Sequence, residues 1–321
     1  ADGAVDLLAR GPDAVAQVGH GRYAAQVAMK KPANISVAAT DVILRLESDS
    51  GDTAMIGHGG LWSSGSLLGD IRVLARNDVR LSPLTADGTT QIGHGGRGAW
   101  GFDAVGDIRV LAGRHVDLDA QTTAGDRATA QIGHGGYYAG EFGAVGDVRV
   151  MARGRVQMRT RSEAGMTQIG HGGYNAYWFT SAGDVVVRAK RKVTVEAYRR
   201  DAGAQIGHGG YGAWFGSAYG DIRVASSRVR VFANGPSSYA QIGHGGEGLG
   251  VEFEEGEGQG GQNGAFSIIG GDIKVRVKGL LDLDARGPWA TAQIGHGGRD
   301  RAFSTVGSSR IGVLAHDAEL L

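Results

Sequence analysis

The sequence predicts an all-β protein, a parallel β-solenoid of about eight three-strand coils with about 37 residues in each coil. Three observations support this fold class. One six-residue motif recurs through the chain at nearly constant spacing. Apolar residues alternate with a period of two in the segments between the motif copies, and no window carries the 3.6-residue apolar stripe of a helix. We therefore expect residues 1–321 to form a single repeat domain.

The first strand of each unit carries the motif Gln-Ile-Gly-His-Gly-Gly, which occurs six times unchanged and twice with small changes. Successive motif histidines are 36 to 40 residues apart, except for one interval of 52. Period-two alternation places Ile and His on one face of the strand and Gln with the glycines on the other. Glycine on both sides of the histidine predicts that a neighbouring wall or loop approaches the backbone closely there. The motif histidines are His20, His58, His94, His134, His171, His208, His244 and His296.

Two more strands are predicted in each unit. The second follows a Gly-Asp pair, as at Asp70 and Asp107, and the third is a similar alternating run, as at Val116. We interpret the segment between the histidine strand and the Gly-Asp pair as a loop of about ten residues. A variable loop follows the third strand, and an acidic, glycine-rich insertion lengthens one unit at about 247–264.

The alternative architecture is an eight-bladed β-propeller, whose repeat length of about 40 residues also fits. Each propeller blade needs four strands, whereas the sequence indicates three in each unit. In a solenoid, equivalent strands of successive units pair in parallel about 4.8 Å apart, so matching side chains form ladders. We favour the solenoid.

Composition excludes several classes of function. The 33 basic and 33 acidic residues balance, so net charge gives no reason to expect nucleic acid as a partner. The chain has no cysteine, which excludes disulfides and thiolate metal sites. No apolar stretch approaches the roughly 18 residues of a membrane span. Glycine contributes 58 residues against 5 prolines, without the every-third-residue pattern of collagen.

The strands Gly-Asp-Ile-x-Val-x-Ala, as at 69–75, and Val-x-Leu-x-Ala, as at 116–120, resemble the repeats of filamentous haemagglutinin-like exoproteins of the two-partner secretion type. The resemblance covers nearly the whole chain. It implies a right-handed parallel β-helix and export from a bacterium to the cell surface or the medium. It also implies a structural role as shaft or filament segment in adhesion or biofilm. Because catalytic motifs are absent from the sequence, we expect no enzymatic activity.

The histidine column is open to two interpretations. As a structural ladder, neutral imidazoles would stack inside the solenoid and satisfy one another, the backbone or buried water. As a metal site, histidines of adjacent coils would bind a divalent transition metal, which is favoured if a glycine bulge turns the rings outward. No cofactor is expected beyond that possible metal. A buried column also predicts depressed imidazole pKa values and stability that falls in acid.

The segment after each histidine strand is aromatic, and neighbouring segments should form one stripe along the solenoid. The stripe either packs as a satellite core or binds host or matrix glycans or another partner. Its candidate binding residues are Trp62, Trp100, Tyr137, Tyr138, Tyr174, Trp178, Tyr211 and Trp214. A basic column is also expected on the outer face of the second strand, at Arg72, Arg109, Arg149, Arg223 and Lys274. Either carboxylates of the third strand, such as Asp117 and Asp282, or a bound polyanion should offset it.

The sequence carries no catalytic motif of the serine-hydrolase, zinc-protease or phosphate-loop type. Its carboxylates are either repeated in every unit or confined to the insertion, whereas a catalytic site needs one unique constellation. Three classes of function stay open: an extracellular or cell-surface adhesin shaft, a metal- or glycan-binding module, and a polysaccharide-active β-helix enzyme. Exposed terminal strands also predict end-to-end self-association.

Overall fold

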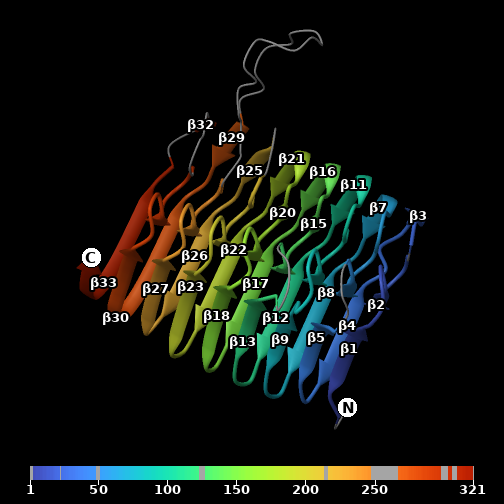
Figure 1. The fold of residues 1–321 in the computed structure, drawn as a ribbon, viewed down its shortest axis with the longest axis horizontal. Helices are drawn as coiled ribbons and strands as arrows, with labels where there is room; N and C mark the ends of the chain where they lie inside the picture. The colour runs from blue at the N-terminus through green and yellow to red at the C-terminus, as the bar shows by residue number, and fades with distance from the viewer. Residues whose placement is uncertain are drawn as a thin grey trace.

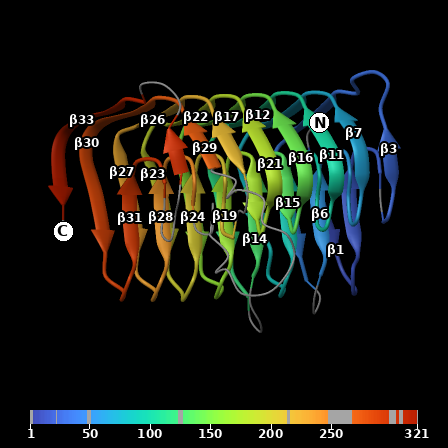
Figure 2. The same ribbon diagram turned by 90° about the horizontal axis from the view of Figure 1, so that it is seen from above.

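The computed structural model describes residues 3–21, 23–47, 51–122, 127–212, 216–246, 267–297, 303–305 and 309–320. These residues form a parallel β-solenoid in which successive coils lie side by side along one axis (Figures 1 and 2). Equivalent strands of successive coils pair in parallel in every column, which confirms the solenoid and excludes the propeller. No helix occurs in the described ranges, and therefore none there is long and apolar enough to cross a membrane. The predicted insertion at 247–264 lies outside the described residues.

Four columns of strands form the walls of the solenoid. The histidine wall contains β2 (Val15–Val18), β6 (Thr53–Ile56), β10 (Thr89–Ile92), β14 (Thr129–Ile132), β19 (Met166–Ile169), β24 (Gly203–Ile206), β28 (Tyr239–Ile242) and β31 (Thr291–Ile294). The aromatic wall contains β3 (Gln26–Ala28), β7 (Ser64–Leu68), β11 (Trp100–Val105), β16 (Gly140–Val145), β21 (Tyr177–Ala182), β25 (Ser217–Tyr219), β29 (Ser267–Gly270) and β32 (Phe303–Thr305).

The other two columns belong to one continuous sheet. The arginine wall contains β4 (Ile35–Ala39), β8 (Ile71–Ala75), β12 (Ile108–Ala112), β17 (Val148–Ala152), β22 (Val185–Ala189) and β26 (Ile222–Ser226). The fourth wall contains β1 (Val5–Ala9), β5 (Val42–Leu46), β9 (Val79–Ser82), β13 (Val116–Ala120), β18 (Arg155–Thr160), β23 (Lys192–Ala197) and β27 (Arg228–Ala233). The long strands β30 (Ile273–Ala285) and β33 (Ile311–Leu320) continue through both walls and join them. A small extra sheet pairs β15 (Gly135–Tyr137) with β20 (Gly172–Tyr174).

Each coil therefore has four strands where the sequence indicated three. The segment interpreted as a loop after the histidine strand contains the strand of the aromatic wall. Its alternation was hard to recognise because the inward positions are held by small residues as often as by large ones, as in Phe102 and Ala104. The propeller is excluded by parallel pairing between coils and not by the strand count.

The main hydrophobic core lies between the histidine, arginine and fourth walls. Strands of the arginine and fourth walls bury alternate residues, as Ile71, Val73 and Ala75 do in β8. The pairing register stacks like on like, so that Val73, Val110 and Val150 follow one another along the axis. Full burial of such a side chain stabilises the fold by about 1.5–3 kcal/mol. A second, smaller core lines the aromatic wall.

Candidate functional site

The motif histidines form one column along the solenoid axis, as the sequence predicts. Neighbouring imidazole rings are stacked with centroids 4.7–5.1 Å apart and planes within 1–11° of parallel. The rings from His58 to His244 are buried, whereas His20 is exposed and His296 is half-buried. The column is therefore interior over six consecutive coils.

Hydrogen bonds along the column define the protonation of each ring. The backbone N–H of His94 donates to Nδ1 of His134 across 3.0 Å, and Nε2 of His134 lies 2.9 Å from the carbonyl oxygen of Gly106. Since Nδ1 accepts, the ring proton belongs on Nε2, where it is donated to the carbonyl. The same pair of contacts recurs from His58 to His296, with Nε2 contacts of 2.6–2.9 Å. The ladder is built from neutral imidazoles.

Burial keeps these rings neutral. It lowers the pKa of His94 and of His208 to about 4, and that of His171 to about 3, although the backbone carbonyl acceptors oppose the shift. The pKa values of His134 and His244 are also held well below their ordinary value, first by burial and then by neighbouring imidazoles. A second proton would have to sit on Nδ1, where it would face a backbone N–H.

The geometry of the column does not favour metal binding. Both ring nitrogens of each imidazole from His58 to His296 already have a backbone partner, so no lone pair points to a shared ion. Within the ranges that the structure describes, no group of three or more His, Cys, Asp or Glu side chains is placed to hold a metal. The imidazole rings from His58 to His244 are buried, so no glycine bulge turns them outward.

The glycine before the histidine is required by the neighbouring coil at every motif copy from Gly19 to Gly243. A Cβ built on Gly57 would overlap the carbonyl oxygen of Gly93, and one built on Gly93 would overlap that of Gly133. The expected close approach is therefore confirmed, and the approaching group is the same glycine one coil further along. This contact brings the backbones of the histidine wall close enough for the imidazoles to stack.

The motif glutamines form a second buried ladder that the sequence did not reveal. The side-chain N–H groups of Gln91 lie 3.2 Å from the carbonyl oxygen of His94 and 3.0 Å from that of Gly133. Equivalent contacts to the following coil occur at Gln17, Gln131, Gln168, Gln205 and Gln241, and all of these except Gln17 are almost fully buried. Alternation correctly placed glutamine opposite histidine. Alternation does not show whether the face that carries the glutamines is buried, because that depends on the segments that pack over it.

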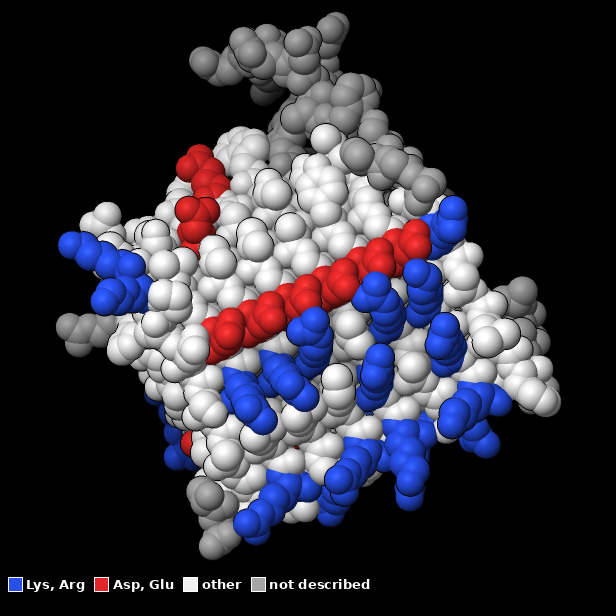
Figure 3. Space-filling model, turned by 180° about the vertical axis from the view of Figure 1, so that it is seen from behind, with Lys and Arg blue, Asp and Glu red and all other residues white. Residues whose placement is uncertain are grey.

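The aspartates of the Gly-Asp pairs form a third ladder. Oδ1 of Asp107 accepts a hydrogen bond of 2.9 Å from the backbone N–H of Asp147, and Asp147 accepts one of 2.8 Å from Asp184. The column runs from Asp70 to Asp272 and is preceded by Asn34, which makes the same contact with Asp70. It corresponds to the continuous acidic stripe in Figure 3. The sequence marked these aspartates only as strand landmarks.

The basic column lies beside that stripe, and three of its five predicted residues pair with the aspartates. Arg149 lies 2.5 Å from Asp147, Arg223 lies 2.5 Å from Asp184, and Lys274 lies 3.1 Å from Asp272. Burial opposes ionisation of Asp184, but the hydrogen bond from Arg223 keeps the pKa of this carboxyl below its usual value. The expected partners on the fourth wall instead bind other arginines. Asp117 pairs with Arg155, and Asp282 with Arg230.

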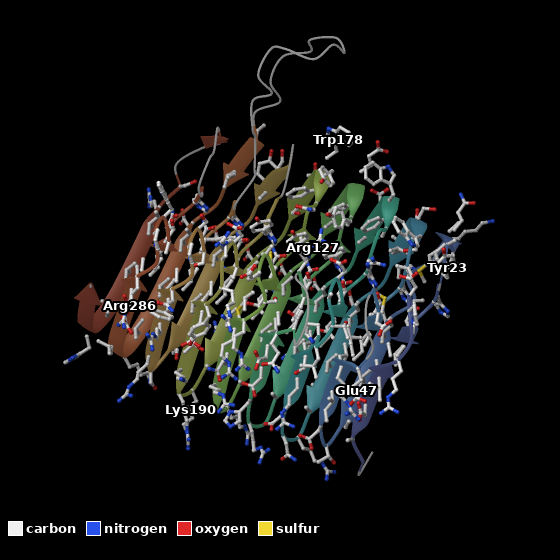
Figure 4. All side chains as sticks on the ribbon, in the orientation of Figure 1. Tyr23, Glu47, Arg127, Trp178, Lys190 and Arg286 are labelled. Carbon is white, nitrogen blue, oxygen red and sulfur yellow. The ribbon has the colours of Figure 1, made fainter. Side chains whose placement is uncertain are left out.

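The aromatic residues do not form one uniform stripe. Tyr137, Tyr174 and Tyr211 stack with centroids 5.0 Å apart, and the first two are buried in a satellite cluster. The tryptophans behave differently: Trp62, Trp100 and Trp178 are 54%, 43% and 54% exposed, and Figure 4 shows Trp178 at the outer edge. Trp214 lies outside the described residues. The satellite-core interpretation is therefore confirmed for Tyr137 and Tyr174, whereas the binding interpretation stays a prediction for the exposed tryptophans.

A pocket of about 490 Å³ opens between these aromatic side chains. Its lining residues are Trp62, Trp100, Tyr137, Tyr138, Tyr177, Gly98, Asp87, Arg97 and Arg127. The hydroxyl of Tyr137 donates to Asp87 across 2.5 Å, and Arg127 lies 3.1 Å from the same carboxylate. Flat apolar rings with a few fixed polar groups at one side are the composition of a small-ligand site.

Neighbouring glycines make room for the exposed indoles. A Cβ on Gly98 would contact the ring of Trp62, and a Cβ on Gly140 would overlap the ring of Trp100. Because Gly140 occupies the coil between them, Trp100 meets Trp178 edge to face at 6.1 Å.

Comparison of the chain with protein-family models, with curated proteins and with solved structures gives no significant match.

Proposed function

We propose that this chain is a non-enzymatic structural shaft, a segment of a bacterial protein that is exported to the cell surface or the medium and serves adhesion or surface structure. The observation that supports it is repetition. Imidazole, amide and carboxylate ladders run through successive coils with the same contacts in each. A repeated contact gives length and stiffness, whereas a reaction needs one unique arrangement of groups.

Surface labelling tests this proposal directly. Antibodies raised against the purified chain should label intact cells of the organism that encodes it, or detect it in the culture medium. A labelled cytoplasmic protein should become accessible only after lysis and serves as the control. Detection of the chain only in the lysed sample would contradict an extracellular shaft.

The aromatic pocket favours a second function for the same chain, the binding of a neutral glycan. Sugar rings present flat C–H faces that pack on exposed indoles, and Asp87 with Arg127 would hydrogen-bond the hydroxyl groups. The double change Trp62→Ala and Trp100→Ala should abolish any signal of the chain on a glycan array. Trp289→Ala is the matched control, because Trp289 is 64% exposed and does not line the pocket. A signal that survives the double change would contradict this second function.

A further inference from the structure

The outer face of the arginine wall carries a long groove on the side away from the exposed tryptophans. The groove has a volume of about 1280 Å³ and is lined by residues of β8, β12, β17, β22, β26, β30 and β33 or directly after them. Seven coils at about 4.8 Å per step give it a length of about 29 Å along the axis. Figure 4 places Lys190 of its rim and Trp178 of the aromatic wall at opposite edges of the molecule.

The floor of the groove is one straight row of side chains. Leu74 pairs with Leu111, and Leu111 pairs with Met151 in the ladder register. The row then continues through Arg188, Ala225, Arg276 and Leu314. Apolar side chains therefore fill its first half, and cationic and apolar side chains share the second.

The charge of the groove has one sign. The cationic residues in its lining are Arg76, Arg153, Arg188, Lys190, Arg276 and Lys278, and the lining contains no Asp or Glu. Arg188 and Arg276 are exposed within the floor itself. Aspartates of the ladder beside the groove already pair with Arg149, Arg223 and Lys274. Figure 3 shows the resulting order, with basic side chains covering the face on one side of the acidic stripe.

We propose that this groove binds an extended acidic polysaccharide, a polymer of uronic acid residues lying parallel to the solenoid axis. A groove that repeats with every coil suits a ligand that also repeats, and cations along it match a row of carboxylates. The apolar floor of Leu74, Leu111 and Met151 offers contact to the C–H faces of sugar rings.

The lining favours a polysaccharide over a single-stranded nucleic acid. Sites for single strands combine positive charge with aromatic side chains on which the bases stack. No Phe, Tyr or Trp lines the groove, and its floor is aliphatic where bases would need rings. The proposed site is separate from the aromatic pocket and does not depend on the shaft function.

Calorimetric titration with an oligogalacturonate tests the proposal. The chain should bind it with an affinity that falls as salt is added. The double change Arg188→Glu and Arg276→Glu should weaken binding by roughly tenfold or more, since two favourable ion contacts become repulsive. Lys30→Glu with Lys31→Glu is the matched control, because it changes the net charge equally at exposed residues outside the groove. Equal weakening by both double changes would show attraction by net charge alone and would overturn the groove.

A second pair of variants tests the apolar floor. Leu111→Asn should weaken binding several-fold, whereas Val105→Asn, an outward change on the aromatic wall, should leave it unchanged. Circular dichroism of each variant establishes that it is folded before binding is compared. No weakening by Leu111→Asn would overturn contact with the floor. Binding of oligo(dT) or of phosphatidylglycerol vesicles in preference to the oligogalacturonate would overturn the assignment of the ligand.

Discussion

Three side chains of the repeat use the same device, a hydrogen bond from one coil to the next. Histidine accepts a backbone N–H of the preceding coil, aspartate accepts one from the following coil, and glutamine donates to carbonyls of the following coil. Each bond adds about 0.5–1.5 kcal/mol, and loss of one partner leaves a buried polar group unsatisfied at a cost of about 1–3 kcal/mol. The repeat is therefore specified by polar groups as much as by its apolar core.

The histidine ladder should make stability depend on pH. An unfolded imidazole titrates near pH 6.5, whereas burial holds the pKa of His94 and of His208 at about 4. Between these values the unfolded chain binds more protons, so stability is full above about pH 6.5 and falls as the pH drops toward 4. Across this pH range, one imidazole lowers the free energy of unfolding by about 3 kcal/mol. Thermal melts should give a lower Tm at pH 5 than at pH 7, and equal values would contradict the neutral ladder.

The aspartate ladder should tolerate asparagine but not alanine. Asp147 accepts the backbone N–H of Asp184 through Oδ1, and Asn34 already makes that contact at the start of the column. Asp147→Asn keeps the acceptor and should cost less than about 1 kcal/mol, whereas Asp147→Ala should cost about 1–3 kcal/mol. Urea unfolding of the two variants measures the difference. Equal costs would indicate that the pairing with Arg149, and not the ladder, carries the effect.

At the scale of the strand, the close approach of coils depends on positions without a side chain. Gly135 in β15 has φ +113, a conformation that costs other residues about 1–2 kcal/mol. A Cβ there would also overlap the carbonyl oxygen of Gly172 in β20. The histidine strand therefore continues into this segment only because both adjacent coils have glycine in register.

Gly135→Ala should destabilise the protein by about 2–5 kcal/mol, through the strained φ and the overlap with the next coil. Gly312→Ala is the control, because a Cβ on Gly312 would have its nearest neighbour 4.0 Å away and its φ is not positive. Denaturant midpoints measured on both variants should shift only for Gly135. A small shift at Gly135 would mean that neighbouring coils can separate without loss of packing.

At the scale of the molecule, stability is distributed along one axis. Each coil contacts mainly the coils before and after it, as expected for a repeat protein with nearest-neighbour interfaces. Among the described residues, β2 and β31 end the histidine wall, and each pairs with one strand of that wall instead of two. Burial reflects this, since the residues of β19 are all buried whereas those of β2 and β31 are half-buried.

Hydrogen exchange should therefore be graded from the middle of the chain to its ends. We expect peptides covering Met166–Ile169 to exchange more slowly than peptides covering Val15–Val18, because local opening is cheaper where one interface is absent. Mass spectrometry after exchange into deuterated buffer measures the difference. Uniform protection would show that the stack opens only as one cooperative unit.

The strands and the histidine column could be predicted from residues that have the same local role in every repeat. Alternation at Ile71 and Val73 identified a strand, and recurrence of the motif histidines identified a column. Once equivalent strands stack in register, matching residues of successive units must lie over one another, so the interior position of His134 followed from Ile132.

What the sequence by itself determined was the repeat, its stacking direction and the identity of the histidine ladder. Only the tertiary structure decided that Gln91 is buried, that Asp147 is an acceptor between coils, that Tyr137 packs inward while Trp100 stays exposed, and that a basic groove crosses the arginine wall. The physical reason is the range of the contacts. Periodicity within one strand indicates which residues share a face. Whether that face is buried depends on segments of other coils that pack against it.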